Sequence, residues 1–158
     1  MDKRWKPSVT VAAIIERAGK FMLVEEQTSE GLKLNNPAGH LEPGESLIDA
    51  CVREALEETT YHFTPTALVG VYMSRRTKAS TGEDITYLRF AFCGELGLAQ
   101  PGATLDTGIE RNLWMSSSEL RACQERHRSP LLMRCVDDYL GGQRLPLPLL
   151  YTDPSVFS

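Results

Sequence analysis

Three glutamates fall close together in the segment REALEET, which spans residues 53–59: Glu54, Glu57 and Glu58. At about 100° of rotation per residue, a helix places these three side chains on one face, within roughly 100° of arc. Neighbouring like charges repel each other, and the cost rises in a cleft of low dielectric. A hard divalent cation such as Mg²⁺ removes that cost, because it prefers carboxylate oxygens and keeps waters that a substrate phosphate can replace. The alternative is a solvated acidic helix face without an ion.

The strongest helix candidate of the chain, residues 46–61, must position these carboxylates. The turn Pro43-Gly44 directly precedes it, Ser46 is a suitable N-cap, and Asp49 three residues later gives a loose form of the capping box. A separate side of this helix is expected to pack on the core, and it consists of Ile48, Val52, Ala55, Leu56 and Thr59.

Strand and helix signals alternate along the rest of the chain. Strands are expected at residues 8–15 and 21–25, joined as a hairpin and followed by a polar loop at 27–31 and an extended segment at 35–39. Two longer strands at 67–74 and 85–95 flank a polar tip at 75–84, and a short strand is expected at 112–115. Helices are expected at 116–123 and 129–140, before a proline-rich tail at 143–158. This order favours an α+β fold of the α/β/α sandwich type, with a mixed β-sheet flanked by helices.

Length and composition bound the class of protein. The 158 residues fit a single domain, 1–158, with 42% hydrophobic and 24% charged residues. A net charge of −4 argues against a general nucleic-acid binder. No apolar run approaches the ~18 residues of a membrane span and the start lacks a secretion signal, so we expect a cytoplasmic protein without membrane contact. Oligomeric state is not indicated.

The cysteines are too widely spaced for a zinc site and are expected to be free thiols: Cys51, Cys93, Cys123 and Cys135.

The spacing around the acidic helix is more specific than its charge. From Gly39, five residues lead to Glu45, and seven more lead to the segment REALEE at 53–58. This spacing resembles the Nudix hydrolase signature, GX5EX7REUXEEXGU, in which U is a bulky apolar residue. The match holds at Gly39, Glu45, Arg53, Glu54, Glu57 and Glu58. Ala55 is a small apolar residue at one U position, Thr60 replaces the expected glycine, and Tyr61 fills the last U.

Further segments scattered between residues 9 and 149 resemble the NudJ-type branch of bacterial Nudix proteins. They are PAGHLE at 37–42, LRF at 88–90, RSPL at 128–131, and GQR at 142–144 with a proline soon after. The resemblance implies the Nudix fold and a phosphatase or pyrophosphohydrolase that acts on nucleoside di- and triphosphates and related compounds, including hydroxymethylpyrimidine diphosphate. Two alternatives stay open: a nucleoside-diphosphate-sugar or dinucleotide pyrophosphatase, and a nucleotide-sensing Nudix module without catalysis.

The resemblance also implies roles for the matched residues. Water attacks a diphosphate with the help of Mg²⁺ or Mn²⁺, which neutralises phosphate charge and orients the leaving group. The implied metal ligands are Glu57, Glu58, Glu54 and the backbone carbonyl of Gly39, and Glu54 also helps to deprotonate the water. Glu45 and Arg53 form an ion pair that holds the loop to the helix and orients the ligands.

The general base stays open, because Gly108 stands six residues before Trp114, where many Nudix proteins have another acid. Four acids nearby are either its substitute or plain surface residues: Asp106, Glu110, Glu83 and Asp84.

The candidate substrate contacts are mostly cationic. Arg75, Arg76 and Lys78 either recognise phosphate or belong to a solvated hairpin tip. Arg89 interrupts the apolar strand TYLRFAF, so its charge either meets a substrate phosphate or pairs with a buried acid. His40, which follows Gly39, either faces the cleft or is structural. The remaining candidates either contact a nucleobase or serve the turn and the packing: Asn35, Asn36, Trp5, Tyr72 and Tyr87.

Overall fold

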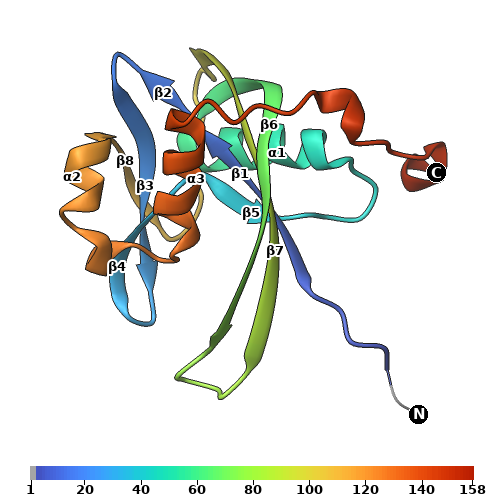
Figure 1. Cartoon of the computed structure of the whole chain (residues 1–158), viewed down its shortest axis with the longest axis horizontal. Helices are drawn as coiled ribbons and strands as arrows, with labels where there is room; N and C mark the ends of the chain where they lie inside the picture. The colour runs from blue at the N-terminus through green and yellow to red at the C-terminus, as the bar shows by residue number, and fades with distance from the viewer. Residues whose placement is uncertain (1–2) are drawn as a thin grey trace.

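The computed structural model describes residues 3–158 and contains two four-stranded sheets (Figure 1). The first sheet has the order β5-β1-β7-β6, and its strands are β1 (Ser8–Ile14), β5 (Ala38–His40), β6 (Tyr61–Thr77) and β7 (Asp84–Ala99). Strands β1 and β7 run parallel, whereas the other two pairs are antiparallel, so this sheet is mixed.

The second sheet is antiparallel and is built around one strand. Strand β3 (Lys20–Thr28) pairs with three others, which are β2 (Glu16–Arg17), β4 (Gly31–Asn35) and β8 (Ile109–Ser116). The chain passes from the first sheet to the second at Ile15, which lies between β1 and β2.

Three α-helices and three short 3₁₀ turns complete the fold. The helices are α1 (Leu47–Thr59), α2 (Ser117–Arg121) and α3 (Leu131–Leu140), and the turns are Gln124–Arg126, Leu147–Leu149 and Pro154–Phe157. Helix α1 packs on β1, β5 and β6, while α2 and α3 pack together beside a separate part of the core. Mixed strand pairing flanked by helices confirms the predicted fold class, although the strands form two sheets instead of one.

Strand β1 is apolar on both faces, which explains its central place. Ala12 and Ile14 belong to the core cluster of α2 and α3, whereas Val11, Ala13 and Ile15 belong to the cluster of α1. A strand buried on both faces reads as a continuous apolar run instead of an alternating one. The segment TVAAII is therefore packed between two parts of the core.

The expected hairpin between residues 8–15 and 21–25 is wrong. Both edges of β1 are taken by β5 and β7, and it is the two-residue strand β2 that pairs with β3. The expected polar loop at 27–31 is also shorter than predicted, since β3 continues to Thr28 and β4 begins at Gly31. Gly31 adopts a φ of +97° in this tight turn, a conformation that glycine adopts without strain.

The two long strands are present but extend well beyond the expected bounds. Strands β6 and β7 pair from Tyr61–Ala99 to Thr77–Asp84, with register shifts confined to the part of β6 before Gly70. Figure 1 shows the far end of this hairpin projecting from the body of the molecule. Strand β1 accompanies β7 only from Tyr87 to Cys93, so the projecting part has no third strand beside it. We call residues 71–90 of the hairpin, which include this projecting part, the arm.

Helix boundaries follow the expected capping residues. The Ser46 hydroxyl accepts a hydrogen bond from the Asp49 N–H at 3.0 Å, and Ser116 and Glu119 form a full capping box at α2. Helix α1 ends two residues earlier than predicted, because Thr60 adopts a left-handed conformation with φ +68° and donates its N–H to Leu56. Helix α3 begins two residues later than predicted and ends at Leu140 as predicted, with Gly141 as its C-cap.

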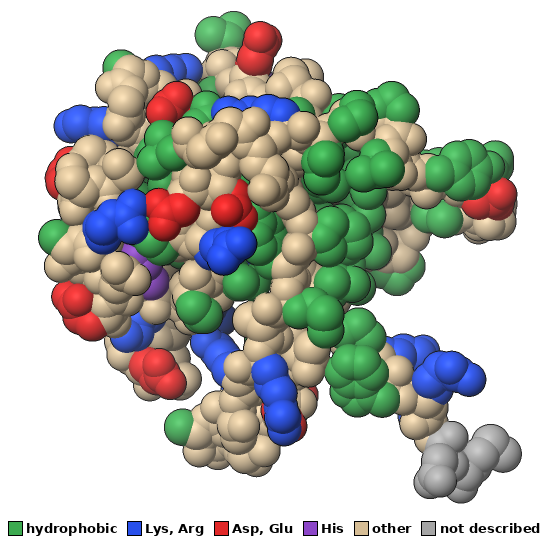
Figure 2. Space-filling view, viewed as in Figure 1, with side chains coloured by type: hydrophobic (Ala, Val, Ile, Leu, Met, Phe, Trp, Pro, Cys, Tyr) green, Lys and Arg blue, Asp and Glu red, His purple; other side chains and the backbone are tan. Residues whose placement is uncertain are grey.

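The tail at 143–158 is held along its first half. Leu145 exchanges two backbone hydrogen bonds with Leu68 on β6, and the Gln143 side chain donates to the Val69 carbonyl at 2.7 Å. Leu147 and Leu150 pack against the α1 core cluster. The end of the tail extends away from the body, and Figure 2 shows hydrophobic side chains gathered along this side of the molecule. Within residues 3–158, none of the helices has the length and apolar character of a membrane span.

Candidate active site

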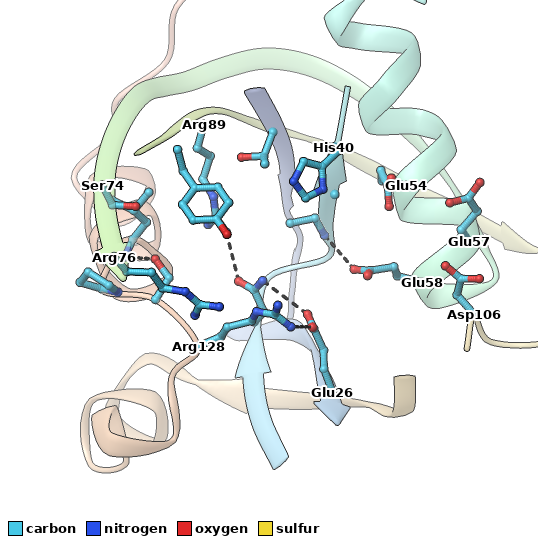
Figure 3. Close-up of a pocket in the computed structure, with 18 of the residues that line it drawn as sticks. Glu26, His40, Glu54, Glu57, Glu58, Ser74, Arg76, Arg89, Asp106 and Arg128 are labelled. Carbon is cyan, nitrogen blue, oxygen red and sulfur yellow. Dashed lines mark hydrogen bonds and ion pairs between the residues drawn. The ribbon is translucent and has the colours of Figure 1, made fainter. Parts of the chain in front are cut away.

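A cavity of about 470 Å³ lies between the two sheets and α1 (Figure 3). Helix α1 contributes Glu54, Glu57 and Glu58 to its wall, and the loop after β7 contributes Asp106. Strands of both sheets and the loop before α3 supply the rest of the lining, including Glu26, Gly39, His40, Ser74, Arg75, Arg76, Tyr87, Arg89 and Arg128. Residues distant in sequence thus meet at one hollow.

The three carboxylates of α1 differ in environment. The Glu57 side chain is 41% exposed, the Glu54 side chain only 12%, and Glu58 is buried. Burial raises the pKa of Glu58 to about 8, and the nearby charges of Glu26, Glu54 and Asp106 add to the rise. The Glu58 Oε1 accepts the Ala38 N–H at 2.9 Å, which opposes the rise. Burial also raises the pKa of Glu54, against the lowering effect of Arg53.

The burial of Glu58 shows that the predicted packing side of α1 is partly wrong. Ala55 and Thr59 are buried as expected, but the other buried residues of the helix are Ala50, Cys51 and Glu58. The acidic face turns toward the cavity instead of bulk water, because Ala50 and Cys51 beside it pack into the core cluster that contains β1. Helical periodicity alone does not reveal that an acidic face borders an internal hollow.

One guanidinium group organises the acidic helix. Arg53 donates from Nε to Glu45 Oε2 at 2.9 Å and from Nη2 to Glu45 Oε1 at 2.7 Å. Its Nη2 also donates to the His40 carbonyl at 2.9 Å, and its Nη1 contacts Glu54 at 2.8 Å and Glu57 at 3.2 Å. The hydrogen bonds from Arg53 lower the pKa of Glu45. Arg53 therefore ties α1 to the loop before it and fixes two of the three carboxylates.

Gly39 leaves room for one of these carboxylates. A Cβ atom at this position would lie 2.0 Å from the Glu54 carboxylate carbon, which is far closer than atoms can approach. The absence of a side chain at Gly39 therefore lets β5 and α1 approach each other.

The side of the cavity formed by Glu54, Glu57, Glu58 and Asp106, which we call the acidic wall, suits a hydrated divalent cation. Among residues 3–158, no three His, Cys, Asp or Glu side chains already converge as a complete ligand set. The reason is visible in the contacts, because Arg53 holds Glu54 and Glu57 while Ala38 holds Glu58. Mg²⁺ requires only one or two carboxylates and keeps several waters, so the hard oxygen donors of this wall fit it.

The model of the NUDIX domain matches residues 4–135, a range that contains every residue of the acidic wall and its supporting loop. The chain belongs to the Nudix family. Members act as hydrolases of phosphoanhydride bonds in small molecules and generally use divalent metal ions, so this protein is a Nudix pyrophosphohydrolase or phosphatase.

Relatives cover most of the Nudix chain. It is 35% identical over 146 residues to the phosphatase NudJ of Escherichia coli K12, which covers 92% of each chain. It resembles the structure of a NUDIX hydrolase from Nitrosomonas europaea with 52% identity and a TM-score of 0.85, covering 94% of this chain and 98% of that one. The structure of a MutT protein from Methanosarcina mazei, at 22% identity and a TM-score of 0.69, shares the fold, covering 89% and 99% of the two chains.

Arg89 is the most deeply buried cation of this Nudix cavity. It is 5% exposed, and its Nη1 and Nη2 atoms donate to the side-chain carbonyls of Asn36 at 3.0 Å and Asn35 at 3.1 Å. Among the described residues, no carboxylate lies within 4.0 Å of Arg89, so the expected alternative of a buried acid partner is not found. Asn36, expected to contact substrate, is buried behind Arg89 and supports it.

The other cations of the cavity divide into paired and unpaired ones. Arg75 forms an exposed ion pair with Asp84 at 2.5 Å, and Arg128 is paired with Glu26. Half-buried Arg76 has no carboxylate within 4.0 Å in the part of the chain that the structure describes. Figure 3 shows Arg76 and Arg89 across the cavity from Glu54, Glu57 and Asp106.

The structure separates the four candidates for the general base. Asp106 lines the cavity, and its backbone N–H donates to the Glu57 carbonyl at 3.1 Å. Glu110 accepts from the Gln27 side chain, Asp84 is held by Arg75, and Glu83 is an exposed residue of the arm, so these three lie outside the lining. Gly108 turns the backbone here with a φ of +92°.

The remaining candidates take different places. His40 and Tyr87 line the cavity with ring centroids 6.4 Å apart, whereas Tyr72 faces α3 and donates to Asp138 at 2.8 Å. Trp5 is exposed, and Trp5 and Lys78 are not part of the cavity wall.

Sequence reasoning missed the pair of Glu26 and Arg128 in the wall. Glu26 ends an apolar strand pattern and is separated from Arg128 by 102 residues, so the sequence carried no local signal for their contact.

Proposed function

We propose that the cavity hydrolyses a phosphoanhydride bond of nucleoside di- or triphosphates and of related diphosphates such as hydroxymethylpyrimidine diphosphate. The observation that carries the proposal is the division of charge across one hollow. Carboxylates from α1 and the loop after β7 occupy one wall, and the wall opposite carries Arg76 and Arg89, which have no carboxylate within 4.0 Å in the described residues 3–158. A polyphosphate chain has the length and charge to bridge a cation site and an arginine pair.

The acidic wall is the proposed metal site. Glu54, Glu57, Glu58 and the backbone carbonyl of Gly39 would hold Mg²⁺ or Mn²⁺, which supplies neutralisation of phosphate charge and activation of water when bound. Arg53 and Glu45 keep Glu54 and Glu57 in place through the contacts described above. We assign the supporting role to this pair because both residues lie outside the cavity lining.

Glu54 is the proposed acceptor of the proton that the attacking water releases. Its pKa is raised by burial, and a carboxylate with a raised pKa is a stronger base. Asp106 is the second carboxylate placed to take this proton, since it lines the same wall. The pH–rate profiles of Glu54→Gln and Asp106→Asn distinguish the two. Substitution of the residue that accepts the proton should remove the fall in rate at low pH, whereas substitution of the other should not.

The side of the cavity that carries Arg76 and Arg89 favours binding of substrates with a free terminal phosphate. Arg76 and Arg89 carry two positive charges with no carboxylate partner within 4.0 Å in residues 3–158. A terminal phosphate group is close to a dianion at neutral pH. In nucleoside-diphosphate sugars and dinucleotides every phosphate is substituted on both sides and carries a single charge, so these compounds match the pair less well. The name of the Escherichia coli relative, phosphatase NudJ, agrees with this preference.

The test is a substrate panel with identified products. Nucleoside di- and triphosphates, hydroxymethylpyrimidine diphosphate, a nucleoside-diphosphate sugar and a dinucleotide are incubated with the enzyme, once with Mg²⁺ and once with EDTA. We expect Mg²⁺-dependent release of phosphate or pyrophosphate from the compounds with a terminal phosphate, and loss of turnover in Glu57→Gln. Intact substrates in the presence of Mg²⁺, beside an active control enzyme, would contradict the proposal.

A further inference from the structure

The arm carries an open sheet edge. Strand β6 is the last strand of its sheet, and the tail covers that edge only at Leu68 and Val69. From Gly70 to Thr77 the pairing with β7 has no register shift, so no bulge interrupts this part of the edge. Natural proteins protect exposed edges with charges, bulges or covering segments. The first half of β6 has bulges and a covering segment, whereas the second half has neither and carries charges only near its end, at Arg75 and Arg76.

The direction of the backbone groups on this edge follows from the hairpin. Lys78 donates its N–H to the Glu83 carbonyl at 2.8 Å, which marks a hydrogen-bonded pair at the tip. Because such pairs alternate along an antiparallel ladder, the even-numbered residues of the arm bond to β7. The N–H and C=O groups of Val71, Met73 and Arg75 therefore point away from β7, and no hydrogen bond to them exists among residues 3–158.

The same residues expose apolar side chains. Val71 is 50% exposed and Met73 is 67% exposed, on the sheet face opposite to Ser74 and Arg76, which line the cavity. Arg75, which also borders the cavity, completes this face, and its charge is compensated by Asp84 at 2.5 Å. An edge without a covering segment or a bulge, with exposed apolar side chains at Val71 and Met73, favours pairing with another strand.

We propose that this edge pairs with the same edge of a second copy of the chain. Centred on Met73, an antiparallel pairing about a two-fold axis sets Met73 opposite Met73 of the second copy, and Val71 opposite Arg75. Every residue in these pairs directs its N–H and C=O outward, so the register satisfies the free groups on both strands. It places the Arg75 stem over the apolar Val71 side chain, and the Asp84 contact keeps the two arginines from repelling each other. A self-complementary patch of this type gives a closed dimer.

Oligomeric state is the first readout, measured by sedimentation velocity over a wide concentration range on the full chain. We expect a dimer for the wild type and for Leu98→Lys, a charge placed on another highly exposed apolar residue, and a monomer for Met73→Lys. Met73→Pro is the sharper variant, because it removes the outward N–H while leaving the bonds to β7 intact. It should also be a monomer with an unchanged circular dichroism spectrum.

Covalent trapping is the second readout. Hydrogen-bonded antiparallel residues have Cα atoms about 5.5 Å apart, within the range of a disulfide. Under mild oxidation, Met73→Cys should form a cross-linked dimer, whereas Leu98→Cys and the wild type with its own four cysteines should not. A wild-type monomer at every concentration would overturn the proposal, as would a dimer that survives in both Met73→Lys and Met73→Pro while Met73→Cys stays uncrosslinked.

Discussion

Arg53 donates two parallel hydrogen bonds to the Glu45 carboxylate, from Nε at 2.9 Å and from Nη2 at 2.7 Å. This two-point contact fixes the plane of the guanidinium group, and the remaining nitrogen is thereby directed at Glu54 and Glu57. A point charge at the same place supplies no such direction, because lysine lacks the planar fork. The position of two cavity carboxylates thus depends on the geometry of a residue outside the cavity lining.

Arg53→Lys should therefore lower kcat about 10- to 100-fold, the usual size of an effect through supporting hydrogen bonds. The measurement is phosphate release at saturating Mg²⁺, with thermal unfolding recorded in parallel. Arg121→Lys is the matched control, since Arg121 forms an exposed ion pair with Asp137 away from the cavity. Equal activity of Arg53→Lys and the control would show that the charge of Arg53 suffices.

Gly39→Ala should displace Glu54. The new methyl group would lie 2.0 Å from the Glu54 carboxylate carbon, so either the side chain or strand β5 must move. We expect a loss of turnover of at least about 100-fold, of the order seen when reacting groups are misplaced by an ångström. Gly141→Ala, at a φ of −72° with the nearest atoms at 3.4 and 3.5 Å, controls for loss of glycine itself. Mg²⁺ affinity measured by calorimetry should fall together with turnover.

Arg89→Gln should raise KM for a nucleoside diphosphate by roughly 10- to 100-fold, from the loss of charge-assisted hydrogen bonds to phosphate. Arg75→Gln should change KM little, because Arg75 is exposed and already paired with Asp84. Steady-state kinetics of both variants on the same substrate make the comparison. Equal KM values would mean that Arg89 holds the Asn35–Asn36 segment in place and does not bind the substrate.

The metal-free protein should lose stability as pH rises, through Glu58. Its pKa in the folded state is about 8, above its ordinary value of 4.5, so between these values the folded state binds one more proton than the unfolded state. The stabilisation is complete below pH 4.5 and is lost as pH rises through 8, with a slope of up to about 1.4 kcal/mol per pH unit between them. Urea unfolding in EDTA measures the slope, and Glu58→Gln should reduce it by the contribution of one proton.

Thr60→Gly should stabilise the protein. A β-branched residue at φ +68° is strained, whereas glycine adopts this conformation readily. The expected gain is about 1 kcal/mol, reduced in part by the greater freedom of glycine in the unfolded chain. Thermal unfolding at fixed pH checks it, and Thr60→Ala, which keeps a Cβ, should gain much less. A lower melting temperature for Thr60→Gly would show that the Thr60 side chain contributes more than its strain costs.

Local signals predicted the parts of the fold that depend on neighbours in sequence. Ser46 and Ser116 cap helices as expected, and the glutamates of α1 share one face as the helical period requires. The cytoplasmic location, the single-domain organisation and the roles of the individual site residues stay predictions.

Contacts between distant segments escaped prediction for a physical reason. The apolar run of β1 shows that a strand is buried, but not which strands flank it, so β1 and β3 were wrongly joined. The pairing of Glu26 with Arg128 and the support of Arg89 by Asn35 and Asn36 span 53 to 102 residues. Such pairs are determined by the packing of whole elements, which carries no short-range pattern.

Arg76 and Arg89, which have no carboxylate partner among residues 3–158, come from the arm, whereas the acids facing them, Glu54, Glu57, Glu58 and Asp106, come from α1 and the loop after β7. Under the proposed function, substrate selection and bond cleavage therefore depend on separate segments of the chain. Substitutions in the arm would change which anionic substrate binds and leave the acidic residues in place. Related enzymes can therefore diverge in substrate specificity while they keep the same catalytic residues.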